Sequence, residues 1–217
     1  MSREEAVVSS YLDRPLREYL DDAAADKPTP GGGSVAALVG ALATTMASMA
    51  GNFTAGREKY QDVEPRVRAD LAVLAEARTA FVDLMHKDMA AYGAVMEAYR
   101  QPKGTDAEKA ARAAAIQKAL AESMQVPLAA TRLAERTLEA AVELANIANA
   151  NLLSDVAVAA VLAEAAFAAS RVNVEVNLAG IKDQRLAAET ARELDERQDT
   201  VAGLRQECLE AIRARQR

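Results

Sequence analysis

A carboxylate, Asp88, lies on the expected apolar face of a long helix. Positions 81, 85, 88, 92 and 95 follow in steps of three and four, and the other four residues there are Phe81, Met85, Tyr92 and Val95. A carboxylate among apolar side chains loses hydration, so it needs a partner or a ligand. A structural ion pair with another helix and a role in proton transfer are both open readings of this placement.

A turn at residues 28–34 has the sequence Pro-Thr-Pro-Gly-Gly-Gly-Ser. Two prolines are excluded from a helix interior and glycines adopt backbone angles closed to other residues, which predicts a shaped turn and a helix that begins at Ser34. The unpaired amides of such a helix start, with Gly31, Gly32 and Gly33 before it, could hold an anion or a polar ligand edge. A plain helix cap after a turn is the alternative.

A second polar turn, residues 149–155, precedes another small and apolar helix. Asp155 falls in the first turn of that helix, where the helix dipole favours a carboxylate with or without a catalytic role. Farther along the same helix, Asn173 and Asn177 are one turn apart on one face. These paired amides could contact a ligand, or they could tie two helices together.

Other kinds of site are excluded by what the sequence lacks. Residues 31–36 fit the loose glycine pattern of dinucleotide-binding folds, but no strand precedes them, and no Gly-Lys-Ser/Thr phosphate loop is present. A transition-metal centre would ordinarily need several histidine or cysteine ligands, whereas the chain has only His86 and Cys208. We therefore expect no metal, and Cys208 is a poor candidate nucleophile because no base accompanies it.

Composition indicates one helical domain that spans residues 1–217. Alanine, the best helix former, supplies 51 of the 217 residues, so we expect an all-α bundle of long, closely packed helices. A net charge of −6 without a basic run argues against nucleic acid or an anionic membrane as partner. One cysteine and no N-terminal signal segment fit a cytoplasmic protein.

The helices that must position these residues can be read from hydrophobic spacing. The helix after the glycine turn is apolar or small on every side, which predicts a central helix surrounded by others. Thr105 and Glu108 have the spacing of a capping box, and Pro127 should interrupt or restart the helical pattern. The last helix is rich in charge, as an outer or pairing helix would be. The expected helices span residues 11–25, 34–54, 65–99, 105–124, 127–147, 154–177 and 182–217.

Five ordered blocks of residues resemble the formiminotetrahydrofolate cyclodeaminase / methenyltetrahydrofolate cyclohydrolase family, over nearly the entire chain. They are Pro30-Gly-Gly-Gly-Ser34-Val-Ala-Ala, Asn52-Phe-Thr54 with Lys59-Tyr60, Asp88 with Tyr92, Asn149-x-Asn151-x-x-Ser154-Asp155, and Asn173-Val-x-Val-Asn177-Leu. The chain departs from the family pattern at Glu58, Ala148 and Ala150.

This resemblance implies an all-helical, homodimeric enzyme of folate one-carbon metabolism. It implies no metal and no cofactor beyond the tetrahydrofolate substrate, in a mono- or polyglutamylated form. In the cyclodeaminase reaction, N10 attacks the formimino carbon on N5 and ammonia leaves. In the cyclohydrolase reaction, water adds to the cationic N5–C–N10 bridge and gives 10-formyltetrahydrofolate. Both pass through a tetrahedral carbon and need proton transfer beside a cation. The sequence leaves both activities open, with the cyclodeaminase slightly favoured.

The resemblance also assigns roles to individual residues. Asp88 would transfer protons and stabilise the cation, and Asp155 is the second acid–base candidate. Lys59 would meet a folate carboxylate. The expected substrate-binding residues are Gly31, Gly32, Gly33, Ser34, Asn52, Lys59, Tyr92, Asn151, Asn173 and Asn177. The competing hypothesis is a non-catalytic helical dimer that binds folate or a partner helix.

Overall fold

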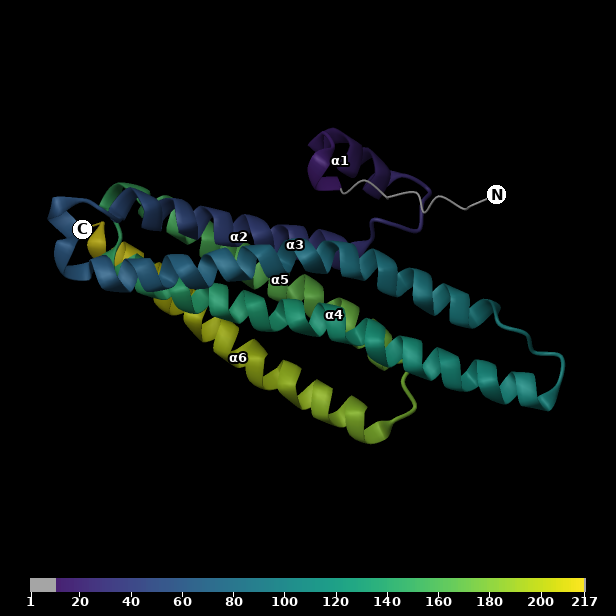
Figure 1. The fold of residues 1–217 in the computed structure, drawn as a ribbon. Coiled ribbons are helices and arrows are strands. Elements are labelled where there is room, and N and C mark those ends of the chain that lie inside the picture. The colour runs from purple at the N-terminus through teal and green to yellow at the C-terminus, as the bar shows by residue number, and fades with distance from the viewer. Residues whose placement is uncertain (1–10, 217) are drawn as a thin grey trace.

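The chain is all helical over residues 11–216, the part that this computed structural model describes, and no strand occurs there (Figure 1). This confirms the predicted fold class. The expectation that no signal segment occurs at the N-terminus concerns residues 1–10, outside the described part. The helices are α1 (Leu16–Ala24), α2 (Gly32–Thr54), α3 (Glu64–Arg100), α4 (Asp106–Ile147), α5 (Leu153–Leu178) and α6 (Gln184–Arg215), with 3₁₀ turns at Tyr11–Asp13, Glu58–Val63 and Ala150–Leu152.

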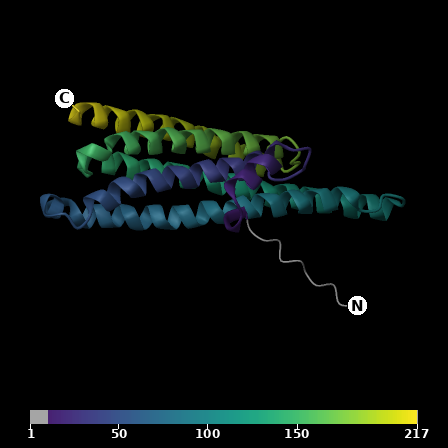
Figure 2. The same cartoon turned by 90° about the horizontal axis from the view of Figure 1, so that it is seen from above.

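Helices α2 to α5 run lengthwise along one another, and α6 packs against α4 and α5 on the outside (Figures 1 and 2). Consecutive long helices alternate in direction, so the start of α2 lies at the same end of the bundle as the end of α5. The short helix α1 stands beside the start of α2, while α3 and α4 project past the other helices as a hairpin. The outer position predicted for the last helix is thus confirmed.

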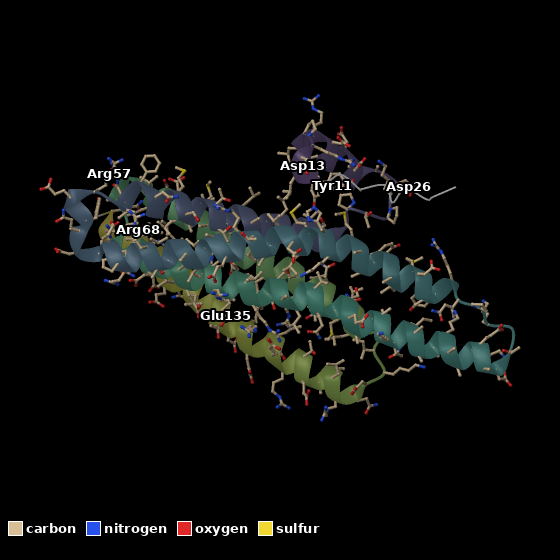
Figure 3. All side chains as sticks on the ribbon, in the orientation of Figure 1. Tyr11, Asp13, Asp26, Arg57, Arg68 and Glu135 are labelled. Carbon is tan, nitrogen blue, oxygen red and sulfur yellow. The ribbon has the colours of Figure 1, made fainter. Side chains whose placement is uncertain are left out.

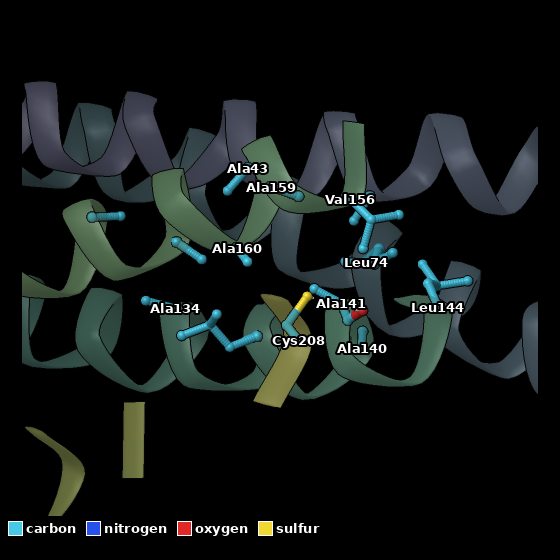
Figure 4. Close-up of a cluster of buried hydrophobic side chains, with 14 of the residues drawn as sticks. Ala43, Leu74, Ala134, Ala140, Ala141, Leu144, Val156, Ala159, Ala160 and Cys208 are labelled. Carbon is cyan, nitrogen blue, oxygen red and sulfur yellow. Dashed lines mark hydrogen bonds between the residues drawn. The ribbon is translucent and has the colours of Figure 1, made fainter. Parts of the chain in front are cut away.

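The core is built largely from alanine, which lets the helix backbones approach closely. Figure 4 shows Ala43, Ala141 and Ala160 from three different helices around Leu74. Gly40 extends this principle, because a Cβ there would lie 2.4 Å from Cε1 of the buried Phe81 ring. The small residues of α2 therefore form the surface on which α3 packs.

Four helices differ from the sequence-based expectation. Helix α1 begins at Leu16 and not at residue 11, because Pro15 separates it from the 3₁₀ turn at Tyr11–Asp13. Helix α2 begins at Gly32, two residues before Ser34, with Gly31 as its N-cap. Helix α4 continues through Pro127, because packing against neighbouring helices maintains a helix that local sequence alone would break. Helix α5 begins at Leu153, so Ser154 is inside it. The capping box at Thr105 and Glu108 is confirmed.

Helix α2 is not surrounded on every side, contrary to expectation. Its side chains Val35, Leu42 and Phe53 are 39%, 47% and 49% exposed. They leave one apolar side of the helix open along its whole length. By length and composition alone, α2 and residues Ala150–Leu178 could each cross a membrane, although 61% and 39% of their most apolar windows are buried within the bundle.

Candidate active site

A pocket of about 370 Å³ lies where α2 begins and α5 ends. The glycine turn forms one wall, α3 contributes Asp88 and Tyr92, and α5 contributes Asn173 and Asn177. The sequence-predicted residues from three distant segments thus meet in one place. The complete lining is Pro28, Thr29, Gly31, Gly32, Gly33, Asp88, Tyr92, Val95, Ser123, Asn173, Val176 and Asn177.

Asp88 is fixed against the start of α2. The backbone N–H of Ser34 donates a hydrogen bond of 2.9 Å to Asp88 Oδ2. The other oxygen, Oδ1, occupies the space above Gly33, where an added Cβ would lie only 2.0 Å away. Burial raises the pKa of the Asp88 carboxyl, and the hydrogen bond from Ser34 opposes this rise. The carboxyl is therefore held rigidly, and its pKa is displaced toward the range useful for proton transfer.

Ser34 supports the site from behind the pocket. Its side chain is fully buried and its Oγ lies 3.1 Å from the hydroxyl of Tyr19, itself only 3% exposed. Ser34 does not line the pocket, so it holds Asp88 through its main chain. Tyr19 was not predicted as a site residue because its spacing marked it only as part of the apolar face of the first helix.

The two asparagines of α5 present polar groups to the opposite side of the pocket. Asn173 Nδ2 donates to the Ala169 carbonyl at 2.8 Å, and Asn177 Nδ2 donates to the Asn173 carbonyl at 2.9 Å. These bonds orient both amides and leave their oxygens as acceptors. A Cβ on Gly32 would come 3.5 Å from Asn173 Oδ1, so the glycine turn and this amide lie in close contact.

Apolar side chains and one hydroxyl complete the walls. Val95 and Val176 line the pocket, and Tyr92 is 42% exposed at its edge. Tyr92 is less buried than its place on the α3 stripe predicted, because α3 here projects beyond α2. Ser123 of α4 also lines the pocket. No local sequence signal indicated Ser123, since its position depends on how α4 packs against the turn.

Four other predicted site residues lie elsewhere: Asn52, Lys59, Asn151 and Asp155. Asp155 is 18 positions before Asn173 on α5, a separation of roughly 27 Å along the helix. Lys59 lies beyond the end of α2, with Nζ 5.4 Å from the centre of the Tyr60 ring. Figure 3 shows this end of the bundle at Arg57, far from Tyr11, which lies by α1 partway along the molecule. One chain therefore does not gather all the predicted residues into one pocket, because α2 and α5 run in opposite directions.

We call these two regions the Asp88 end (residues 28–34, 88–95 and 173–177) and the Asp155 end (residues 52–60 and 149–155). At the Asp155 end, Thr54 Oγ1 accepts a 2.8 Å hydrogen bond from the backbone of Asn149. The Asn149 side chain accepts in turn from the backbone N–H of Asn151 at 3.1 Å. The asparagine turn is thus attached to the end of α2.

The remaining candidates for chemistry lie outside the pocket. His86 borders a different, open hollow on α3. Cys208 is completely buried, and burial raises the pKa of its thiol to about 11. Among residues 11–216, no group of three or more histidine, cysteine, aspartate or glutamate side chains could hold a metal ion.

Comparison of the sequence with known proteins gives matches that agree with one another. The model of the formiminotransferase-cyclodeaminase family matches residues 15–196. A methenyltetrahydrofolate cyclohydrolase from Methylorubrum extorquens is 36% identical over 200 residues, which cover 92% of this chain and 96% of that protein. A mouse formimidoyltransferase-cyclodeaminase is 35% identical over 174 residues, 80% of this chain but only 32% of that longer protein.

A solved structure shares the fold as well as the sequence. The crystal structure of formiminotetrahydrofolate cyclodeaminase from Thermotoga maritima superposes with a TM-score of 0.85 at 35% sequence identity. The match covers 94% of this chain and 98% of that one. The whole helical arrangement is therefore common to both proteins.

Proposed function

The chain belongs to the formiminotransferase-cyclodeaminase family, and on this premise we propose that it is a folate enzyme acting at the N5–C–N10 bridge of tetrahydrofolate. Relatives matched over most of their length are a methenyltetrahydrofolate cyclohydrolase and a formiminotetrahydrofolate cyclodeaminase. Ring closure with ammonia release and water addition to the methenyl bridge would share one site, since both form a tetrahedral carbon between the same nitrogens.

The observation that carries this function is Asp88 at the floor of the pocket, buried enough to raise its pKa and fixed by Ser34. In the cyclohydrolase reaction, the water oxygen bonds to the bridge carbon while the carboxylate accepts the water proton. The N5–C bond then breaks as the new hydroxyl loses its proton and becomes the formyl carbonyl, and N5 takes up the proton held by the carboxyl group. In the cyclodeaminase reaction, N10 bonds to the carbon of the protonated formimino group and passes its proton to the carboxylate. The carboxyl group gives this proton to the resulting amino group, the C–N bond breaks, ammonia leaves and the methenyl cation remains.

The same carboxylate would stabilise the cationic bridge by its charge. Low hydration in a half-buried site strengthens this attraction, and the fixed Ser34 hydrogen bond removes the need to reorient the carboxylate during the reaction. The amides of Asn173 and Asn177 would receive the polar edge of the pterin, and Tyr92 and Val95 would contact its apolar faces.

We further propose a homodimer in the cytoplasm, with no nucleic acid or membrane partner. The net charge of −6 supports the absence of an anionic polymer or membrane surface as partner. Both reactions combine addition, elimination and proton transfer without a change of oxidation state. A tetrahydrofolate derivative is therefore the only small molecule, besides water, that they require.

Purified protein offered methenyl- and formiminotetrahydrofolate separately tests the function by absorbance. Loss of the methenyl band faster than the spontaneous rate shows cyclohydrolase activity, and its appearance from the formimino substrate with ammonia release shows cyclodeaminase activity. Asp88→Asn should reduce turnover at least about 100-fold, because proton transfer by a positioned group contributes this much. If the wild type turns over neither substrate, the proposed enzymatic function is refuted. Full turnover by a folded Asp88→Asn variant would remove Asp88 from the mechanism.

A further inference from the structure

Helix α1 buries a single side chain against the bundle. Tyr19 is the only buried residue of this helix and is 3% exposed, whereas Leu16 and Leu20 are 64% and 56% exposed. The ribbon shows α1 beside the start of α2, away from the other long helices (Figure 1). The position of α1 against the bundle therefore depends on Tyr19.

The Tyr19 hydroxyl reaches the first turn of α2. It lies at a hydrogen-bond distance of 3.1 Å from Ser34 Oγ, and the Ser34 side chain is fully buried. Within residues 11–216, this is the one hydrogen bond that either hydroxyl makes. Because a buried hydroxyl without a partner is unfavourable, the bond constrains where Ser34 can lie.

Ser34 carries this constraint to Asp88. The first turn of α2 is rich in glycine, and its N-cap, Gly31, provides no side-chain cap. The Ser34 N–H belongs to the helix start, where amides have no partner within the helix, and it donates instead to Asp88 Oδ2 at 2.9 Å. The hydroxyl and the amide of one residue thus link Tyr19 on α1 to Asp88 on α3.

Tyr19 itself is not placed to transfer a proton to the substrate. It does not line the pocket. Burial raises the pKa of Tyr19, the hydrogen bond with Ser34 opposes this rise, and the charge of Asp88 adds to it. The phenol therefore stays protonated at neutral pH and serves as a hydrogen-bond partner of Ser34.

Building on the proposed function, we propose that Tyr19 is a positioning residue for Asp88: its hydroxyl holds Ser34, and the Ser34 amide holds the carboxylate against the substrate bridge. Without this hydroxyl, no side chain fixes the glycine-rich start of α2, and the carboxylate loses its alignment with the reacting atoms. Helix α1, none of whose residues lines the pocket, thereby controls the position of the reacting group.

Removal of one hydroxyl tests this role. Tyr19→Phe keeps the buried ring and breaks only the bond to Ser34. We expect kcat to fall about tenfold, less than the roughly 100-fold cost of a 1 Å displacement, because Asp88 is loosened and not removed. KM should stay within about twofold, because no side chain that lines the pocket changes.

Tyr11→Phe is the matched control. The Tyr11 ring packs edge-on against Tyr19, with ring centres 5.3 Å apart, but the Tyr11 hydroxyl donates to Asp22 Oδ2 at 2.7 Å. The control thus loses a hydroxyl from the same pair of rings without touching Ser34, and its kcat should stay within about twofold of wild type. Unchanged kcat in a folded Tyr19→Phe variant, or an equal fall in Tyr11→Phe, would overturn the proposal.

Double variants test whether Tyr19 acts through the carboxylate. Added to Asp88→Asn, Tyr19→Phe should reduce turnover by less than about twofold, because no carboxylate remains to be positioned. Ser34→Ala breaks the same hydroxyl bond from the other side and keeps the amide, so it should also lower kcat about tenfold, and Tyr19→Phe should add little to it. Effects that multiply in either pair would contradict the proposal. If Tyr19→Phe does not fold, a fully active Ser34→Ala variant contradicts it equally.

Amide hydrogen exchange tests the link without relying on catalysis. In ¹⁵N-labelled Tyr19→Phe, the exchange rate of the Ser34 amide, relative to that of Leu138 in the buried part of α4, should rise about tenfold. Tyr11→Phe should leave this ratio unchanged. A Tyr19→Phe ratio equal to that of wild type would refute the link. If the wild type shows no turnover, the proposed function fails, and these rates still confirm or refute the hold of Tyr19 on Ser34.

Discussion

Asp88 is held between a backbone donor and a glycine, and each constrains one of its oxygens. The backbone N–H of Ser34, in the first turn of α2, fixes Oδ2. The missing side chain of Gly33 makes room for Oδ1. The glycines of the turn are therefore not equivalent. Gly31 has open space around it, with the nearest atom to an added Cβ, the Pro28 carbonyl oxygen, 3.9 Å away.

Substitution of Gly33 by alanine should displace the Asp88 carboxylate. The new Cβ would overlap Asp88 Oδ1, so the side chain must rotate and lose its hydrogen bond to Ser34. We expect kcat to fall about 100-fold, the scale of a misplacement of about 1 Å. Gly31→Ala is the matched control, and it should keep kcat within a few-fold of wild type. Equal effects of the two substitutions would contradict the steric argument.

Asp70 is a second buried carboxylate, outside the pocket, and it should destabilise the fold at neutral pH. Its Oδ2 is buried without a hydrogen-bond partner, and burial, followed by the nearby Glu143, raises its pKa from 3.8 to about 6. Between these values the folded protein binds more protons than the unfolded chain, so this group's contribution to stability falls as the pH rises.

Asp70→Asn should therefore raise the free energy of unfolding at pH 7. Because the side chain is partly hydrated, we expect a gain of about 1 kcal/mol, less than the full pKa shift would give. At pH 4 the gain should largely disappear. Urea denaturation at both pH values measures the difference, with the exposed Asp62→Asn as control. A variant less stable than wild type at pH 7 would show that Asp70 has a compensating partner.

At the scale of elements, the sequence predicted where the helices lie but not which of them are buried by others. Periodicity and the capping box at Thr105 predicted most helices near their observed bounds. The same periodicity could not distinguish a central helix from a helix with one apolar side exposed, because both are apolar on every side. The prediction that Pro127 interrupts or restarts the helical pattern was wrong, because packing against neighbouring helices outweighs the local effect of a proline.

One hydroxyl links the end of α2 to the asparagine turn that precedes α5. Thr54 Oγ1 donates to the Ala50 carbonyl at 2.7 Å and accepts from the Asn149 backbone at 2.8 Å, and the side chain is fully buried. Thr54→Val would leave the Asn149 N–H unpaired, and we expect a loss of about 1–3 kcal/mol by urea denaturation.

Thr44→Val is the matched control for this junction. Thr44 is equally buried, but its hydroxyl donates only within its own helix, to the Ala41 carbonyl at 2.7 Å. The control should lose less than about 1 kcal/mol, because no other backbone group depends on the hydroxyl. If Thr44→Val lost as much free energy of unfolding as Thr54→Val, removal of any buried hydroxyl, and not loss of the bond to Asn149, would explain the destabilisation.

At the scale of the whole molecule, the sequence indicated candidate site residues but not their distribution in space. Asp88 and the two asparagines of α5 meet in one pocket because α3 and α5 both pack on α2. Asp155 was placed with them on the strength of shared blocks along the chain, which contain no information on helix direction. The antiparallel course of α2 and α5 separates Asp155 from Asp88 in one chain.

Thermal unfolding should reveal the proposed homodimer as a dependence on protein concentration. Binding of a second folded copy stabilises the native state by mass action, so the midpoint temperature of a dimer rises with concentration. With an unfolding enthalpy of about 0.7 kcal/mol per residue, a dimer of this length should gain about 1–2 °C for each tenfold increase. Calorimetry of wild type over a hundredfold range should show the rise. Val161 is an exposed apolar residue of α5, and Val161→Glu should show no rise if this side of the helix is covered in the dimer. A wild-type midpoint independent of concentration would contradict the homodimer.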